Sequence, residues 1–215
     1  MTDAINYNAY LRELVLKHVN HEAPVLDVGA GIGTFASAMR DEGIDVRAFE
    51  PDSQQSAAIR DKEIECHDDI NAISSGSTGS IYSLNVLEHI DDDVAAMRDW
   101  GRVLTSGGRL VLYVPAFQVL FSDMDRKVGH FRRYSRASLV AKVEAAGYDV
   151  IASRYVDSIG FLATLAYKAF ARPGGGINRR SLLIYDRALF PVSILCDLLA
   201  NRFFGKNVLV VARKV

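Results

Sequence analysis

Cysteine pairs, excess charge and long apolar runs are all scarce in this sequence, and each scarcity argues against a class of protein. The 215 residues include only two cysteines, Cys66 and Cys196, which lie far apart and outside any CxxC or histidine-rich spacing. We therefore expect neither a disulfide framework nor a metal site, and a reducing cytosol fits best. The formal net charge is −1, so the molecule as a whole has no electrostatic attraction to nucleic acid.

No apolar run is long enough to cross a bilayer. The two most apolar stretches, residues 158–171 and 181–204, are interrupted by charged residues, among them Lys168, Asp186, Arg187 and Asp197. They fall short of the ~20 apolar residues that a spanning helix needs, and the N-terminus lacks a signal pattern. We expect a cytoplasmic protein with no transmembrane segment. The two apolar helices could form extra core, a homodimer surface or a cover over a hydrophobic acceptor.

Short apolar strands alternate with amphipathic helices through most of the chain. Strands are expected at residues 24–28, 45–50, 64–67, 80–85, 109–114, 148–155 and 207–212, and helices at 2–19, 34–42, 53–62, 91–104, 136–146, 158–171 and 181–204. Glycine-rich turns are expected at residues 76–79, 106–108 and 172–176. The alternation predicts one α/β domain over residues 1–215, with a parallel sheet covered by helices on both faces.

The predicted topology locates a ligand site. Right-handed crossovers place the first three strands on one side of the sheet and the fourth and fifth on the other. Ligands bind such sheets at the carboxyl ends of the strands, where the order reverses. The site is therefore expected around residues 29–33, 50, 68–69 and 85–89. A long charged and aromatic loop over residues 116–135 is also predicted to be functional.

A glycine loop follows the first predicted strand, in the run Val25-Leu26-Asp27-Val28-Gly29-Ala30-Gly31-Ile32-Gly33-Thr34. The dinucleotide fingerprint of hydride-transfer enzymes would have its third glycine at position 34, where this chain has threonine. Further motifs are Glu50 at the end of the second strand, Asp68-Asp69-Ile70 after the third, and Asn85-Val86-Leu87-Glu88-His89-Ile90 after the fourth. The alternative for the glycines is a tight strand–helix turn without a ligand.

These motifs resemble those of class I S-adenosylmethionine-dependent methyltransferases, in particular the small-molecule bacterial subgroup of methyltransferase types 11, 12 and 23. The resemblance covers residues 25–114 strongly and implies a doubly wound, Rossmann-like seven-stranded sheet whose last strand is antiparallel. S-adenosylmethionine would be the cofactor. Glu50 would accept hydrogen bonds from the ribose hydroxyls, and Asp69, or Asp68 in the other register, would bind the adenine amine beside Ile70. The expected cofactor residues are Asp27, Gly29, Ala30, Gly31, Gly33, Glu50, Pro51, Asp68, Asp69, Ile70, Asn85, Val86 and His89.

Catalysis and acceptor binding are predicted from fewer residues. His130, in the loop 116–135, and His89 are the candidate bases, because histidine titrates near neutrality. Arg132, Arg133 and Tyr134 are candidates for binding an anionic or phenolic acceptor, with a scaffold role for that loop as the alternative. Tyr7 and Tyr10 could form a lid over the cofactor from an N-terminal helix within residues 1–20, or could simply pack that helix.

The predicted function is methyl transfer to oxygen or nitrogen of a small metabolite, hydrophobic or anionic. A non-catalytic partner subunit with the same fold is one rival, and a nucleic-acid or peptide methyltransferase is another. The near-neutral charge argues against nucleic acid. So does the fourth-strand motif, which reads Asn85-Val86-Leu87-Glu88 where many nucleic-acid methyltransferases carry an Asn/Asp-Pro-Pro-Tyr/Phe signature.

Overall fold

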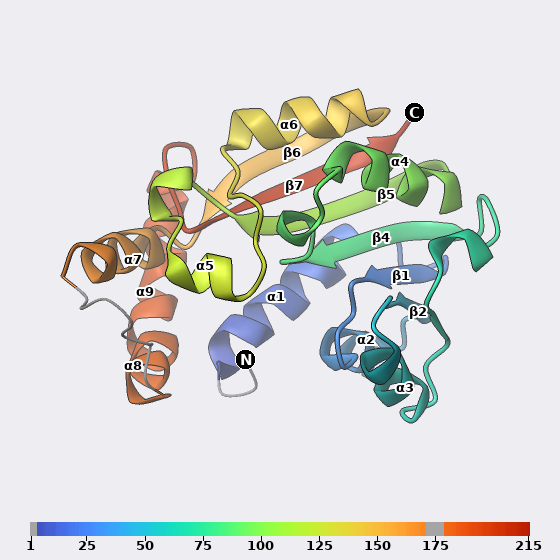
Figure 1. The fold of residues 1–215 in the computed structure, drawn as a ribbon, viewed down its shortest axis with the longest axis horizontal. Coiled ribbons are helices and arrows are strands. Elements are labelled where there is room, and N and C mark those ends of the chain that lie inside the picture. Colours follow the sequence, from blue (N-terminus) through green and yellow to red (C-terminus); the bar gives the residue numbers. More distant parts are fainter. Residues whose placement is uncertain (1–3, 171–178) are drawn as a thin grey trace.

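A single sheet of seven strands organises the chain, in the order β3-β2-β1-β4-β5-β7-β6 (Figure 1). The computed structural model describes residues 4–170 and 179–215. The strands are β1 (Val25–Val28), β2 (Val46–Phe49), β3 (Cys66–His67), β4 (Thr78–Leu84), β5 (Leu104–Pro115), β6 (Tyr148–Val156) and β7 (Asn207–Lys214). β7 runs antiparallel to β5 and to β6, whereas β1 to β5 pair in parallel. The predicted fold, including the direction of the last strand, is confirmed.

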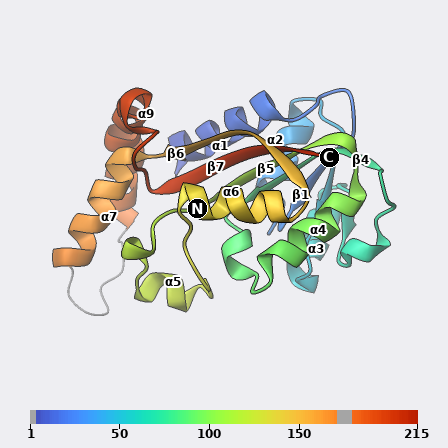
Figure 2. The same cartoon turned by 90° about the horizontal axis from the view of Figure 1, so that it is seen from above.

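Helices cover both faces of this sheet (Figure 2). Helices α1 (Ile5–His18), α2 (Thr34–Asp41) and α3 (Ser53–Arg60) pack on one face. Helices α4 (Asp93–Val103) and α6 (Arg136–Ala145) pack on the other, where Trp100 is buried. Two apolar clusters, one on each face, therefore enclose the central strands, as expected for a parallel sheet buried on both sides.

The predicted loop over residues 116–135 contains regular structure that periodicity did not indicate. It holds the 3-10 turn η3 (Gln118–Leu120) and the short helix α5 (Asp123–Lys127). Two smaller 3-10 turns, η1 (Ile70–Ala72) and η2 (Leu87–His89), follow β3 and β4. The three turns and α5 are each too short to produce a helical repeat in the sequence, so the sequence pattern could not reveal them.

A group of helices lies beyond the carboxyl ends of the parallel strands (Figure 1). It consists of α7 (Ser158–Phe170), α8 (Arg179–Ile184), the π-helical turn η4 (Tyr185–Leu189) and α9 (Phe190–Ala200). The single helix predicted over residues 181–204 is thus continuous over residues 179–200 and contains a π-helical turn. Pro191 stands at the start of α9, where it has no N–H to continue the preceding hydrogen-bond ladder. The break predicted at residues 172–176 lies outside the described residues.

The turn predicted at residues 106–108 is part of a longer strand. β5 begins at Leu104 and passes through Ser106, Gly107 and Gly108, while its register against β4 shifts between the pairs Thr78–Leu104 and Ser80–Arg109. Gly107 has a φ of 73°, which suits an irregularity of this kind. The strand is extended toward the end of the sheet opposite the predicted ligand site.

Candidate functional site

The glycine loop lies where the strand order reverses, between β1 and α2. Gly29, Gly31 and Gly33 have φ values of 72°, 59° and 75°, a region that residues with a side chain rarely adopt. A Cβ on Gly29 would lie 2.5 Å from the side chain of Val86, and one on Gly33 would lie 3.0 Å from Ile59. Packing therefore excludes a side chain at position 29 unless Val86 shifts, and at position 33 it would require a small movement of Ile59.

Gly31 differs from the other two glycines of the loop. Among the described residues, a Cβ there would approach only Oε1 of Gln55, at 3.4 Å, so their packing leaves this side of the loop open. The Gly31 N–H donates to Oε2 of Glu50 at 2.8 Å, while Oε1 of Glu50 accepts from the Asp52 N–H at 3.0 Å. Each carboxylate oxygen keeps lone pairs for further donors. The loop and the end of β2 thus form a cradle that suits a hydroxyl-bearing ligand.

Behind the glycine loop, Asp27 is enclosed within β1. Its side chain is buried and the Oδ2 atom has no hydrogen-bond partner among the described residues. Burial, with a smaller contribution from the Glu50 carboxylate, raises the pKa of Asp27 to about 7. Asp27 therefore lies under the predicted site as a buried acid close to neutrality.

The residues expected to contact adenine lie at the end of β3. Asp69 caps the turn η1, because its Oδ1 accepts from the Asn71 N–H at 2.9 Å, and Asp68 forms an ion pair with Arg60 at 3.3 Å. Both acids are exposed, and Ile70 is half-buried against the core. Pro51 is exposed beside Glu50, and Ala30 is half-buried in the glycine loop. The fold thus brings these predicted residues to one edge of the sheet.

Asn85 and Val86 complete this edge from β4. Asn85 has a φ of 55° and its N–H donates to the Tyr113 carbonyl at 2.7 Å. Asparagine tolerates this left-handed conformation better than most residues, and the chain turns there into η2. Val86 contacts the glycine loop from this position, so the post-β4 motif and the loop pack together directly.

A second group of polar residues lies beside the first, where η2 meets the loop 116–135. His130 Nδ1 lies 2.8 Å from Asp125 Oδ1, and His130 Nε2 lies 3.7 Å from Glu88 Oε1. The rings of His89 and His130 meet edge to face, with centroids 4.6 Å apart. The loop is fixed to η2 because the Phe131 N–H donates to the Glu88 carbonyl at 2.8 Å.

Two carboxyl groups near His130, those of Glu88 and Asp125, have pKa values far from their ordinary ones. Glu88 is fully buried and neither carboxylate oxygen has a hydrogen-bond partner among the described residues. Burial raises the pKa of Glu88 to about 8. Burial also opposes ionisation of Asp125, but hydrogen bonds from Arg133 and His130 hold its pKa at about 2. One acid is therefore mostly protonated at neutral pH and the other is a permanent anion.

His89 is the more exposed of the two histidines. Burial of part of the ring and the charge of His130 lower the pKa of His89. One ligand atom from each of Glu88, His89 and His130 lies within 4.8 Å of the others. This geometry suits a relay of protons, and its donor set would also suit a divalent cation.

Most of the polar atoms predicted to bind an acceptor have partners inside the protein. Arg132 pairs with Asp91 and Asp93 at 3.0 Å each, and the buried Tyr134 hydroxyl donates to Asp93 Oδ2 at 2.9 Å. Arg133 pairs with Asp125, yet its Nη1 atom is buried with no hydrogen-bond partner in the described part of the chain. The scaffold alternative therefore accounts for the contacts of Arg132 and Tyr134, and Arg133 keeps one donor available.

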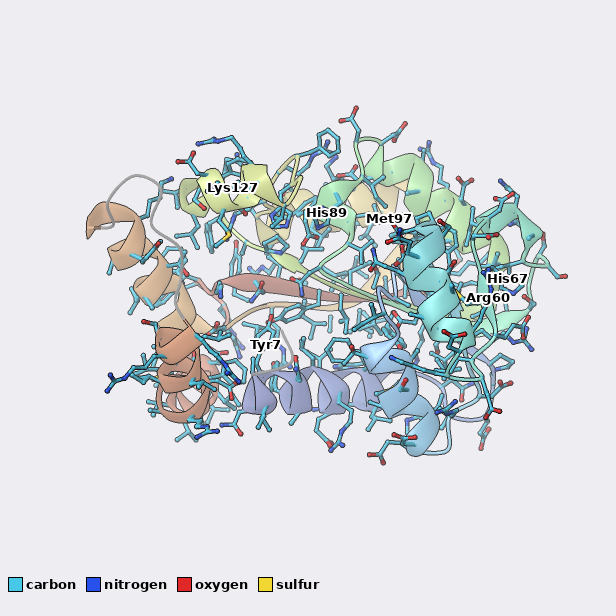
Figure 3. All side chains as sticks on the ribbon, turned by 60° about the horizontal axis from the view of Figure 1, so that its bottom comes forward. Tyr7, Arg60, His67, His89, Met97 and Lys127 are labelled. Carbon is cyan, nitrogen blue, oxygen red and sulfur yellow. The ribbon has the colours of Figure 1, made fainter. Side chains whose placement is uncertain are left out.

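The two tyrosines predicted to form a lid have different surroundings. The Tyr7 hydroxyl lies 3.3 Å from that of Tyr113 at the end of β5, and both Tyr7 and Tyr10 pack edge-on against Phe190. Figure 3 shows Tyr7 projecting from α1 toward the sheet, with His89 across the strand ends, near the segment that carries Lys127. Tyr7 thus borders the site, whereas Tyr10 packs α1 against α9.

Sequence reasoning did not assign a role to Glu88 or Asp125, although both lie in motifs that it identified. Asp125 precedes His130 by five residues, and its Oδ2 also accepts from the Ser122 N–H at 2.8 Å. A Ser-x-x-Asp pattern at the start of α5 is a capping signal that could have indicated a fixed carboxylate. No sequence signal shows that Glu88 is buried, because its burial depends on the loop of residues 116–135 packing over it in the folded chain.

Comparisons with known proteins agree with this geometry. Residues 5–153 match a family described as a methyltransferase domain. A ubiquinone biosynthesis O-methyltransferase of Xanthomonas oryzae pv. oryzae (strain PXO99A) is 31% identical over 100 residues, which cover 42% of this chain and 42% of that protein. An uncharacterized methyltransferase of Mycobacterium sp. (strain KMS) is 28% identical over 119 residues, or 53% and 47% of the two chains. The match thus spans less than half of each relative.

Solved structures share the fold. A SAM-dependent methyltransferase from Archaeoglobus fulgidus superposes with a TM-score of 0.66 at 14% identity, covering 98% of this chain and 94% of that one. Geranyl diphosphate C-methyltransferase from Streptomyces coelicolor A3(2), crystallised with Mg²⁺, geranyl diphosphate and S-adenosyl-L-homocysteine, gives a TM-score of 0.65 at 15% identity, covering 96% and 77% of the two chains.

Proposed function

This chain belongs to the class I S-adenosylmethionine-dependent methyltransferases, and from that premise we propose that it methylates an oxygen or nitrogen of a small metabolite. The observation that carries the proposal is the position of His130, held between Asp125 and Glu88 beside the strand ends. The name of the Xanthomonas relatives, ubiquinone biosynthesis O-methyltransferase, supports an oxygen acceptor. An acceptor hydroxyl or amine loses a proton on methylation, and a histidine at this place could accept it.

Residues of the first polar group would hold the cofactor. Glu50 would accept from the ribose hydroxyls, Asp69 or Asp68 would accept from the adenine amine, and the open side of Gly31 would admit the ligand to the backbone. When bound, S-adenosylmethionine would supply a sulfonium methyl group for in-line transfer to the acceptor, with its sulfur as the leaving group. Much of the rate would therefore come from alignment of donor and acceptor by these residues.

His130 would take the proton as the acceptor atom bonds to the methyl carbon and the sulfur keeps the electron pair of the broken bond. The Nδ1–H donates to Asp125, which leaves Nε2 with the lone pair that a base requires. Asp125 acts as a positioning residue, since it fixes the ring and would stabilise its protonated form. His89 remains the alternative base, because its ring adjoins that of His130.

The acceptor pocket would lie between His130 and Arg133. The buried Nη1 of Arg133 is a cationic donor without a partner in the described part of the chain, so a carboxylate, phosphate or phenolate on the acceptor would satisfy it. Glu88, protonated at neutral pH, could donate to the same acceptor. Tyr7 would close the pocket from the side of α1.

Replacement of His130 tests this assignment. Calorimetry should show that the wild-type chain and His130→Ala bind S-adenosylhomocysteine equally well. Release of S-adenosylhomocysteine with a panel of phenols, hydroxy acids and amines should fall about a hundredfold or more in His130→Ala, because loss of a general base has effects of this size. His21→Ala is the matched control, since His21 is exposed in the loop after α1.

Three outcomes would contradict parts of the proposal. Absence of cofactor binding by the wild-type chain would overturn the enzymatic function itself, whereas unaltered turnover in His130→Ala would remove only that histidine from the mechanism. Turnover that a chelator abolishes and Mg²⁺ restores would assign Glu88, His89 and His130 to a cation instead of a proton relay.

A further inference from the structure

Helix α9 turns its polar side chains toward the protein. Ser193 is fully buried, where its Oγ donates to Asp157 Oδ1 and accepts from the Ile159 N–H, both at 2.9 Å. Asp197 accepts from the N–H groups of Asp157 and Ser158 at 2.7 and 2.8 Å. These contacts satisfy the otherwise unpaired donors at the start of α7, as a helix requires. The polar face of α9 is thus its structural face.

The opposite side of the helix exposes large apolar side chains. Leu195, Leu198, Leu199 and Phe203 are 67%, 75%, 84% and 73% exposed, and Val192 is also exposed. We call these five residues the apolar face. Within α9, Val192, Leu195 and Leu199 recur at intervals of three and four residues and Leu198 lies three residues after Leu195, so these four lie along one side of the helix, and Phe203 follows in the turn after it. Folding of the described chain leaves them uncovered, although contiguous apolar surface usually marks an interaction site.

The exposed charges of the stretch that carries the apolar face have a single sign. From Arg179 to Lys206, every charged residue classed as exposed is an arginine, namely Arg179, Arg180, Arg187 and Arg202. The acids of the same stretch point inward: Asp186 is buried, where it accepts from the N–H groups of Asn6 and Tyr7, and Asp197 is bound to the start of α7. The exposed surface is therefore apolar and cationic.

We propose that the apolar face and its arginines bind the surface of an anionic lipid bilayer, with α9 lying in the interface. A helix with exposed leucine and phenylalanine flanked by arginine has the composition of an interfacial anchor. The described residues contain no helix of the length and hydrophobicity needed to span a membrane, so contact would be limited to one leaflet. A second copy of the chain is a poorer partner, because apposed faces would bring the arginines together.

Bilayer contact would bring the border of the candidate site to the lipid. The Asp186 contacts tie this group of helices to the first turn of α1, which carries Tyr7. Lys168 of α7 donates to the carbonyls of Val119 and Phe121 at 2.7 and 2.8 Å, in the loop that leads to His130. The group of helices that carries the apolar face thus also contacts two elements that border the candidate site.

Vesicle flotation tests the proposal without cofactor or acceptor, so its result does not depend on the proposed reaction. The wild-type chain should float with vesicles of phosphatidylcholine and phosphatidylglycerol, and less with phosphatidylcholine alone or in high salt. Leu195→Ser combined with Leu199→Ser should lower the bound fraction at least tenfold. Ile151→Ser is the matched control, because Ile151 is 56% exposed on β6, and it should float like the wild type.

Two results would overturn the proposal. One is failure of the wild-type chain to float with either type of vesicle. The other is a dimer in sedimentation equilibrium that Leu195→Ser with Leu199→Ser dissociates while vesicle binding is unchanged, which would assign the face to a second copy. Thermal unfolding of the double variant should match that of the wild type, because both leucines are exposed, and this match excludes misfolding as the cause of lost binding.

Discussion

The sheet and the helices α7 to α9 place polar and apolar side chains in opposite ways. In β5, Leu110, Leu112 and Val114 are fully buried between the covering helices, and polar groups such as Glu50 and Asn85 gather at the strand ends. In α9, by contrast, Ser193 and Asp197 face the protein while Leu198 and Leu199 face outward. The two regions have similarly apolar sequences but opposite orientations.

The difference shows that hydrophobicity has two roles in this chain. Apolar residues of the sheet hold the fold together, because their burial supplies the main driving force of folding. Those on the outside of α9 contribute little to stability and are available for binding. The inward polar groups of α9 instead hold neighbouring helices by capping their free N–H groups.

The largest predicted effect comes from making the same substitution in both regions. Leu112→Ser should destabilise the protein by at least about 3 kcal/mol, because it leaves a cavity and buries a hydroxyl. Leu199→Ser should change stability by less than about 0.5 kcal/mol, since surface substitutions rarely do more. Urea unfolding followed by circular dichroism measures both. Equal losses in the two variants would mean that α9 is part of the core after all.

A pH-dependent effect of similar size is expected from Asp27, the buried acid of the sheet whose Oδ2 has no partner among the described residues. Its folded pKa of about 7 exceeds the ordinary value of 3.8, so the folded state binds the proton more tightly than the unfolded state. The contribution of Asp27 to stability is then greatest at acid pH and falls as pH rises toward 7, by up to about 1.4 kcal/mol per pH unit, and levels off above that.

Asp27→Asn should remove that contribution. The difference in unfolding free energy between the variant and the wild type should therefore change with pH between about 4 and 7 and be constant at higher pH. Denaturant unfolding of both proteins at a series of pH values gives this difference directly. A difference that does not vary with pH would show that Asp27 ionises normally in the folded chain.

The smallest predicted effect concerns the glycine loop, where alanine substitutions distinguish a loss of cofactor affinity from a loss of stability. Gly31→Ala should lower affinity for S-adenosylhomocysteine about tenfold or more, while the left-handed φ costs about 1 kcal/mol of stability. Gly29→Ala should lose more stability than Gly31→Ala, because its Cβ would overlap Val86. Calorimetry and thermal unfolding distinguish the two losses. Greater stability loss in Gly31→Ala than in Gly29→Ala would contradict the distinction.

Much of the fold could be predicted because strand and helix patterns repeat over several residues. The strands and the helices of the sheet lie within a few residues of the predicted bounds, except that β5 begins at Leu104 and runs through the predicted turn at residues 106–108. The strand-end location of residues 29–33, 50, 68–69 and 85–89 follows from topology. The short η3 and α5 could not be predicted, nor could the π-helical turn before Pro191, because one or two turns of helix leave no period to detect.

The sequence by itself determined the alternation of strands and helices, the glycine loop and the residues gathered at the strand ends, because these depend on spacing along the chain. Only the tertiary structure decided that Glu88 is buried without a partner, that Asp125 holds His130, and that α9 faces outward with its leucines. Each of these depends on contacts between residues far apart in sequence. Such contacts form only when the whole chain packs, so the spacing of residues along the chain does not encode them.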